Sequence, residues 1–151
     1  MSRSPSEKPA TRCLVLGYDG SDGARRAASW AASDLPPDGR LVLVRAGRPL
    51  HLPPSPLASA DERAQVGHAI FDELMLDGDE ALMDVQLTTE VSDEDPVTAL
   101  LEAAQRHGAT AIVLGCEQHS RLHRALGVVT SELLQRSPVP VISVPAGVDS
   151  Q

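Results

Sequence analysis

Residues whose side chains could bind an anion gather in one late segment, GCEQHSRLHRALGVVTSE at residues 115–132. The segment contains four basic side chains and, near its start, the acid Glu117. The basic residues are His119, Arg121, His123 and Arg124. Arginines bind anions, Thr130 and Ser131 add hydroxyls, and a following helix would direct its free backbone N–H groups to the same place. The segment predicts an anion or phosphate site. The alternative is a solvated loop whose arginines balance nearby acids.

A metal site is a second alternative for this segment. Cys116, His119 and His123 place three possible ligands within eight residues. The paired cysteine spacing of structural zinc sites is missing. We therefore expect no metal here.

The second chemical segment is Gly17-Tyr18-Asp19-Gly20-Ser21. Asp19 could accept a hydrogen bond from an adenine amino group or a ribose hydroxyl. Asp and Ser between a strand and a helix are also ordinary turn and capping residues. Both roles stay open at this point.

Apolar runs and turn residues predict the elements that position these segments. Strands are expected at 13–17, 41–44, 85–91, 111–115 and 139–144. Helices are expected at about 22–33, 60–76, 96–107 and 128–136, with a loop at 116–126 and an open question over 80–83. Ser59 and Glu62 have capping-box spacing, Asp95-Pro96 predicts a helix start, and Gly108 a helix end.

Strict alternation of strands and helices predicts a single doubly wound α/β domain, flavodoxin-like or Rossmann-like. We expect a five-stranded parallel sheet of order 3-2-1-4-5, with the alternating strand at 85–91 near an edge. Ligands of such sheets bind where the strand order reverses, at the carboxyl ends of the first and fourth strands. The segments at residues 17–21 and 115–132 should therefore meet there.

Composition excludes several classes of function. The chain has 151 residues and a net charge of −8, which argues against nucleic acid and an anionic membrane as partners. The only lysine, Lys8, lies in a predicted tail, so no P-loop lysine is present. Dinucleotide, hydrolase and metalloprotease motifs are missing too. No catalytic residue is predicted.

The predicted organisation is one domain at 12–146, between a disordered tail at 1–11 and a short tail at 147–151. No signal peptide or membrane span is evident, so a cytoplasmic setting is expected. Twelve of the 21 acidic residues lie between Asp61 and Asp95, with Arg63 the one base among them.

Four blocks of sequence together resemble the universal stress protein family over about residues 12–145: VLGYDGSDGARRAASWAA, LVLV, EDPVTALLEAAQRHGATAIVLG and SPVPVISVP. The resemblance implies a cytoplasmic, adenine nucleotide alpha hydrolase-like domain with a role in stress response. It also implies a homodimer through the last strand, which contains Val139, Val141, Ile142 and Val144. Many members of the family bind ATP, a few hydrolyse it slowly, and others bind no nucleotide. The resemblance therefore implies at most a weak ATPase.

The resemblance also implies nucleotide-binding positions. Asp19 matches the adenosine-side aspartate, with Gly20 and Ser21 beside it, and Val44 matches the position whose backbone contacts adenine. Gly115 matches the first glycine of the phosphate motif G-x2-G-x9-G-[ST]. The arginines Arg121 and Arg124 could supply charge by another route.

The rest of the chain departs from that motif. Gln118 replaces the second glycine, as in the branch of the family that does not bind ATP. Gly127 comes one residue early, and Val128-Val129 follows where a small hydroxyl residue is required. If the segment is instead aligned without a gap, Val128 replaces the last glycine. Thr130 could replace the missing hydroxyl.

Two hypotheses follow. The first is a dimeric stress-response or signalling module that lacks ordinary ATP binding and acts through an unidentified protein partner or another small ligand. The second is an ATP- or AMP-binding protein with a divergent phosphate loop, in which Mg²⁺ binds only with the nucleotide.

Overall fold

The structure is a computed structural model that describes residues 12–46, 59–76, 79–116 and 120–145. The tails predicted at 1–11 and 147–151 lie outside these ranges, as do Gln118 and His119. None of the helices in the described ranges combines the length and apolar character needed to cross a bilayer.

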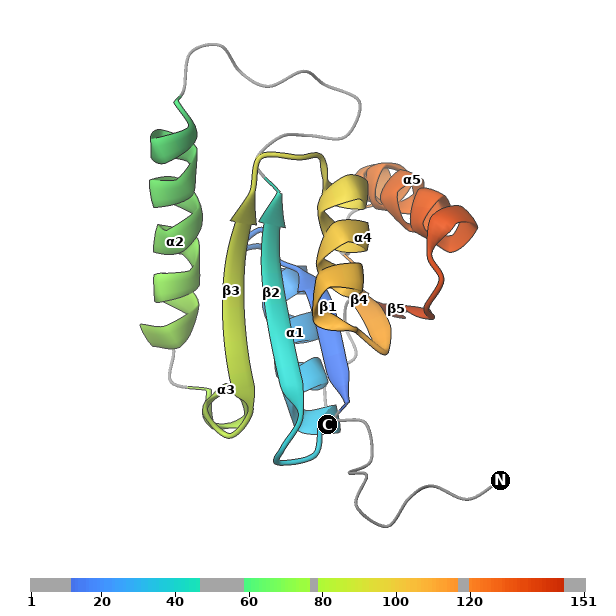
Figure 1. Ribbon diagram of the computed structural model, residues 1–151. Coiled ribbons are helices and arrows are strands. Elements are labelled where there is room, and N and C mark those ends of the chain that lie inside the picture. The colour runs from blue at the N-terminus through green and yellow to red at the C-terminus, as the bar shows by residue number, and fades with distance from the viewer. Residues whose placement is uncertain (1–11, 47–58, 77–78, 117–119, 146–151) are drawn as a thin grey trace, which may run out of the picture.

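Strands and helices alternate along the chain (Figure 1). The strands are β1 (Cys13–Gly17), β2 (Arg40–Ala46), β3 (Gln86–Ser92), β4 (Ala111–Gly115) and β5 (Val141–Val144). The helices are α1 (Asp22–Asp34), α2 (Ala60–Leu76), α3 (Glu80–Met83), α4 (Pro96–His107) and α5 (Ser120–Arg136).

The sheet has five parallel strands in the order β3-β2-β1-β4-β5, which confirms the predicted doubly wound topology. Leu16 of β1 lies between Leu43 of β2 and Val113 of β4. The strand order therefore reverses between β1 and β4, as the sequence predicts. The alternating strand, β3, is an edge strand, also as predicted.

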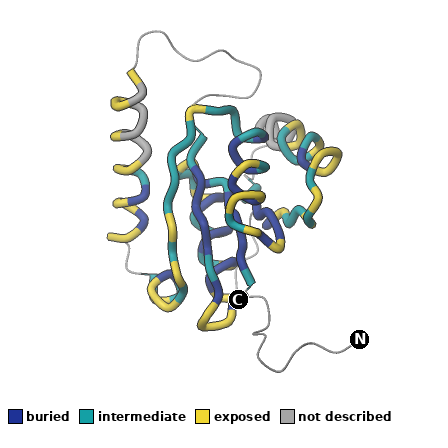
Figure 2. The backbone as a smooth tube through the Cα atoms, viewed as in Figure 1, coloured by how far each residue is buried: buried dark blue, intermediate teal, exposed yellow. Residues whose placement is uncertain are grey.

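Each face of the sheet packs against its own helices. Leu14 and Leu16 belong to a core shared with α1, α2 and α3, whereas Cys13 and Val15 face a core shared with α4 and α5. α1 lies behind the sheet and α4 in front of it (Figure 1). The central strands are the most continuously buried part of the backbone (Figure 2).

Predicted helix ends are confirmed where local polar chemistry specifies them. Asp95 accepts a hydrogen bond from the Thr98 amide at 3.0 Å, and Pro96 begins α4. Gly108 ends that helix with a left-handed φ of 63°, which glycine adopts without penalty. The Ser59–Glu62 capping box forms with reciprocal hydrogen bonds of 3.1 and 3.3 Å.

Several boundaries differ from prediction. The largest error concerns α5, which begins at Ser120 rather than near Val128, so most of the predicted loop at 116–126 is helical. β5 begins at Val141 rather than Val139, since Pro140 has no N–H for the ladder. Residues 80–83 form the short helix α3, whose N-terminus is capped by Asp79.

Candidate functional site

The carboxyl ends of β1 and β4 bring the two predicted chemical segments together. A Cβ added to Gly115, at the end of β4, would collide with the carbonyl group of Gly23 and lie 3.0 Å from the Ala24 amide nitrogen. The first turn of α1 therefore packs directly on the end of β4. Gly115 is needed for this close approach of two backbones.

Asp19 and Ser21 shape the turn from β1 into α1. Asp19 Oδ1 accepts a hydrogen bond from the Ser21 amide at 3.0 Å, and Ser21 Oγ accepts one from the Ala24 amide at 3.2 Å. Gly20 between them has a φ of +84°. The ordinary turn and capping roles are thus real, yet Asp19 is exposed and its Oδ2 accepts no hydrogen bond from a described residue.

Helix α2 covers the same turn, through contacts that the sequence did not reveal. The rings of Tyr18 and Phe71 stack with centroids 5.9 Å apart, and both residues are buried. A Cβ on Gly20 would lie 3.0 Å from Ile70 Cγ2. Two of the three aromatic residues in the chain therefore hold α2 against the candidate site.

The end of β2 supplies a cation that the sequence analysis missed. Arg45 Nη1 donates a 3.3 Å hydrogen bond to the Asp19 carbonyl oxygen. Val44, expected at the end of this strand, is buried two residues before its last residue, and its carbonyl accepts the Tyr18 amide at 2.8 Å. Arg45 and Ala46 are the residues that end β2, so a search for charge just past Val44 would have found the arginine.

On the other side of the site, Cys116 and Ser143 lie side by side. Cys116 Sγ is 2.8 Å from Ser143 Oγ, and the Cys116 amide donates to the Val144 carbonyl at 3.0 Å. Ser143, on a strand predicted only as apolar, was also missed. Among the side chains that the structure describes, no three potential ligands meet in a metal cluster, but those of His119 and His123 are not among them.

The other cysteine is far from this site. Cys13 begins β1, at the end of the sheet opposite Cys116, and both cysteines are free thiols. Burial raises the pKa of the Cys13 thiol more than the nearby Arg40 guanidinium lowers it. Cys13 is thus a buried apolar side chain with little thiolate character.

Because α5 begins earlier than predicted, the end of the predicted phosphate segment lies within this helix. Gly127, Val128, Val129 and Thr130 lie inside the helix rather than at its N-terminus. The free N–H groups belong instead to the first turn, which starts at Ser120. Val128 is exposed, and Val129 packs against the core beneath α5. Arg121 and Arg124 belong to the first turns of α5, but their side chains lie outside the described part.

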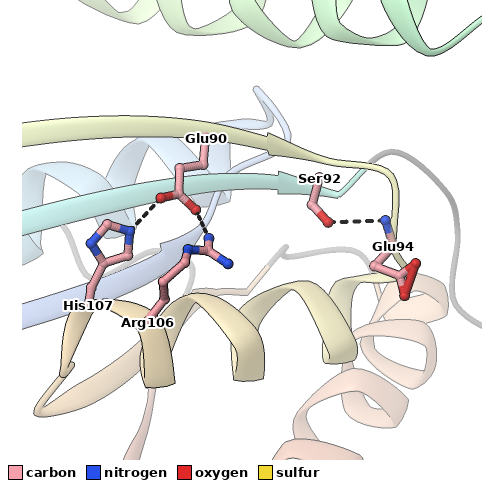
Figure 3. Close-up of polar contacts among 5 residues, drawn as sticks. All are labelled: Glu90, Ser92, Glu94, Arg106 and His107. Atoms are coloured by element: carbon pink, nitrogen blue, oxygen red, sulfur yellow. Dashed lines mark hydrogen bonds and ion pairs between the residues drawn. The ribbon is translucent and has the colours of Figure 1, made fainter.

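A cluster of charged side chains also lies between β3 and α4 (Figure 3). The Glu90 carboxylate on β3 accepts hydrogen bonds from Arg106 and His107 on α4. Burial raises the pKa of Glu90, but these hydrogen bonds and the two neighbouring charges lower it below its ordinary value. The cluster fastens the sheet edge to α4, aided by a 2.9 Å hydrogen bond from Arg40 to the His107 carbonyl.

Comparisons with known proteins agree with this architecture. A crystal structure of a universal stress protein family member from Burkholderia pseudomallei is 25% identical, with a TM-score of 0.64 over 89% of this chain and 96% of that one. A universal stress protein in complex with cAMP is also 25% identical, with a TM-score of 0.62 over 91% and 98%.

A family member from Arabidopsis thaliana with AMP bound shares the fold at 15% identity, with a TM-score of 0.62 over 92% of this chain and 94% of that chain. The search of curated proteins gave no match. Residues 11–145 match the sequence model of the Universal stress protein family. This chain therefore belongs to the universal stress protein family.

Proposed function

We propose that this protein is a stress-response or signalling module that does not bind ATP through the phosphate motif of its family, and that acts through protein partners or another small ligand. The observation that carries the proposal is the helical state of Gly127 to Thr130 within α5. Amides in a helix interior already donate to carbonyls four residues earlier. They are not free to donate to a phosphate.

The side chains at these positions support the same proposal. The family motif calls for glycine and a small hydroxyl residue where this chain has Val128 and Val129. Val129 packs against the core shared by α4 and α5, so it also has a structural role there. A branched side chain at such a position blocks the close backbone approach that glycine allows.

A second candidate function is binding of an adenosine monophosphate, AMP or cAMP. The observation in its favour is that Asp19, the residue matched to the adenosine side, is present and exposed, whereas the glycine and hydroxyl positions of the phosphate side are changed. Arg45 beside the Asp19 carbonyl adds a cation. Two structures of similar proteins contain cAMP and AMP, respectively. In this candidate, Arg45 or the first turn of α5 would bind a single phosphate. The candidate function also includes binding of ATP, with Mg²⁺ bound only together with the nucleotide, but the altered phosphate segment supports ATP binding less than binding of a monophosphate.

The proposal keeps a cytoplasmic homodimer built on the last strand. β5 ends the sheet order and pairs only with β4 within the described chain, which leaves its outer edge open. Val141 and Ile142 are partly buried on opposite faces of the sheet. An open apolar edge strand favours pairing with a second copy.

A panel of melting curves tests the proposed function. ATP, ADP, AMP and cAMP are added separately at millimolar concentration, with and without Mg²⁺. A ligand at a hundred times its Kd stabilises a fold by about 2.7 kcal/mol, so binding gives a clear rise in Tm. We expect no rise with ATP. Asp38, an exposed residue between α1 and β2, is the control position. A rise with AMP or cAMP that Asp19→Ala removes and Asp38→Ala keeps supports the second candidate, and a rise with ATP contradicts the first.

A further inference from the structure

Three large apolar side chains are exposed where α2 ends and α3 follows. Met75, Leu76 and Met83 expose 41%, 85% and 67% of their surface. Their neighbours Leu74 and Leu82 are buried in the core. Both helices therefore have an apolar side in the core and further apolar side chains in water, and exposed apolar groups that gather in one place mark interaction sites.

These three residues are called here the α2–α3 surface. Leu76 and Asp79, the N-cap of α3, are three residues apart, so their Cα atoms lie within about 11 Å of each other, and Met83 ends the four-residue helix that follows Asp79. α1 contacts both helices. Ser29 donates a hydrogen bond to Asp79, and Arg25 Nη2 forms a salt bridge of 3.8 Å with Glu73 Oε2 of α2. Exposed residues alternate with buried ones at the C-terminal end of α2 and with buried and intermediate ones around α3 (Figure 2).

Acidic side chains flank the α2–α3 surface. Asp72 lies one helical turn before Met75, Glu80 begins α3, and Asp84 follows Met83. All three acids are exposed, and none forms an ion pair with a residue that the structure describes. They belong to the stretch from Asp61 to Asp95 that carries 12 of the 21 acidic residues and a single base.

We propose that the α2–α3 surface docks a basic amphipathic segment of a partner protein. Its apolar side chains would cover Met75, Leu76 and Met83, and its Arg or Lys residues would pair with the flanking acids. Unbranched methionines adapt to apolar partners of different shape. A second copy docked by the same surface would place acids against acids, and a nucleic acid would be repelled.

The first test uses a labelled helical peptide with leucines on one face and arginines on the other, followed by fluorescence anisotropy without nucleotide. A peptide with glutamates in place of the arginines is the charge control. We expect the arginine peptide to bind and the glutamate peptide not to bind. Leu76→Ser should weaken binding about tenfold or more, while Leu134→Ser, at an exposed leucine on α5, should not.

The second test separates local pairing from the overall negative charge. Glu80→Gln/Asp84→Asn and the control Asp38→Asn/Glu102→Gln both change the net charge from −8 to −6, since each removes two acids. Only the first pair should weaken binding and reduce its dependence on salt.

Three results would overturn the proposal. The first is an absence of peptide binding, and the second is an equal loss in both charge variants or no loss in Leu76→Ser. The third is self-association of the unaltered protein that Leu76→Ser abolishes, which would make the surface a contact between copies. None of these results bears on the nucleotide site, because no nucleotide is present.

Discussion

Gly115 at the end of β4 packs against the carbonyl group of Gly23 in the first turn of α1. The first glycine of the phosphate motif is therefore needed for the fold, whether or not the protein binds a nucleotide. Its presence cannot be taken as a sign that phosphate binding persists.

Gly115→Ala should destabilise the protein, since a Cβ at this position has no room without displacing α1. Overpacking of this kind costs about 1 to 3 kcal/mol. Gly127→Ala is the matched control: nothing lies within 4 Å of a Cβ there, and alanine in a helix gains about 0.5 to 1 kcal/mol over glycine. Urea unfolding measures both, and equal stability of Gly115→Ala and the unaltered protein would refute the packing role.

Val129 and Val128 allow a matched test of the structure of α5. Val129→Ser should cost about 1 to 2 kcal/mol because it removes packing from the core and leaves a hydroxyl there. Val128→Ser changes an exposed side chain and should stay within about 0.5 kcal/mol. Thermal unfolding compares the two, and equal effects would show that α5 does not have this orientation.

The phosphate segment can also be tested by restoring the motif. Gln118→Gly with Val128→Gly and Val129→Ser should lower stability, because a glycine at position 128 and the lost core side chain at position 129 weaken the helix α5, which includes both valines. If the altered segment is what prevents ATP binding, the triple variant should gain some affinity, measured by equilibrium dialysis with labelled ATP. A triple variant that stays folded without any gain would place the cause elsewhere in the site.

We expect Glu90 to make a contribution to the stability of the fold that depends on pH. Although burial raises its pKa, contacts with His107 and Arg106 bring the pKa below the ordinary 4.5. A carboxyl group with a lowered folded pKa stabilises the fold above its unfolded pKa, and this gain is lost as pH falls through the folded pKa. Glu90→Gln should therefore lower the urea midpoint at neutral pH and have less effect in acid.

Glu102→Gln is the control for this prediction, since Glu102 is exposed on the same helix, α4. It should change the midpoint little at either pH. A Glu90→Gln effect of the same size at neutral and acid pH would show that the ion pairs do not cause it.

The proposed dimer makes a separate prediction. Val141→Asp places a charge on the edge strand β5 and should convert a dimer to a monomer in sedimentation velocity. Leu134→Asp, at an exposed position on α5, should leave the sedimentation coefficient unchanged. Circular dichroism checks that both variants are folded, and a folded Val141→Asp dimer would exclude β5 as the interface.

The sequence predicted the sheet and most helix ends because these depend on local patterns. Runs such as LVLV specify buried strands, and Asp95, Pro96 and Gly108 specify the ends of α4 through their own backbone chemistry. The start of α5 was wrong because residues 116–126 contain basic side chains without a clear apolar period. Those residues lack the local signal that marked the other helix starts.

The missed site residues depend on contacts between distant parts of the chain. Arg45 reaches the Asp19 carbonyl, and Ser143 meets Cys116, only after the strands pair. Glu90 likewise meets Arg106 and His107 across β3 and α4. The order of the sheet predicts which loops come together, but not which side chains reach across them.

The most direct test of the central claim is isothermal titration calorimetry of the purified protein with ATP and Mg²⁺, and separately with AMP and cAMP. The account predicts no saturable heat with ATP, because the amides of Gly127 to Thr130 are committed to helix α5. Saturable ATP binding with one site per chain, lost in Asp19→Ala and kept in Asp38→Ala, would contradict it.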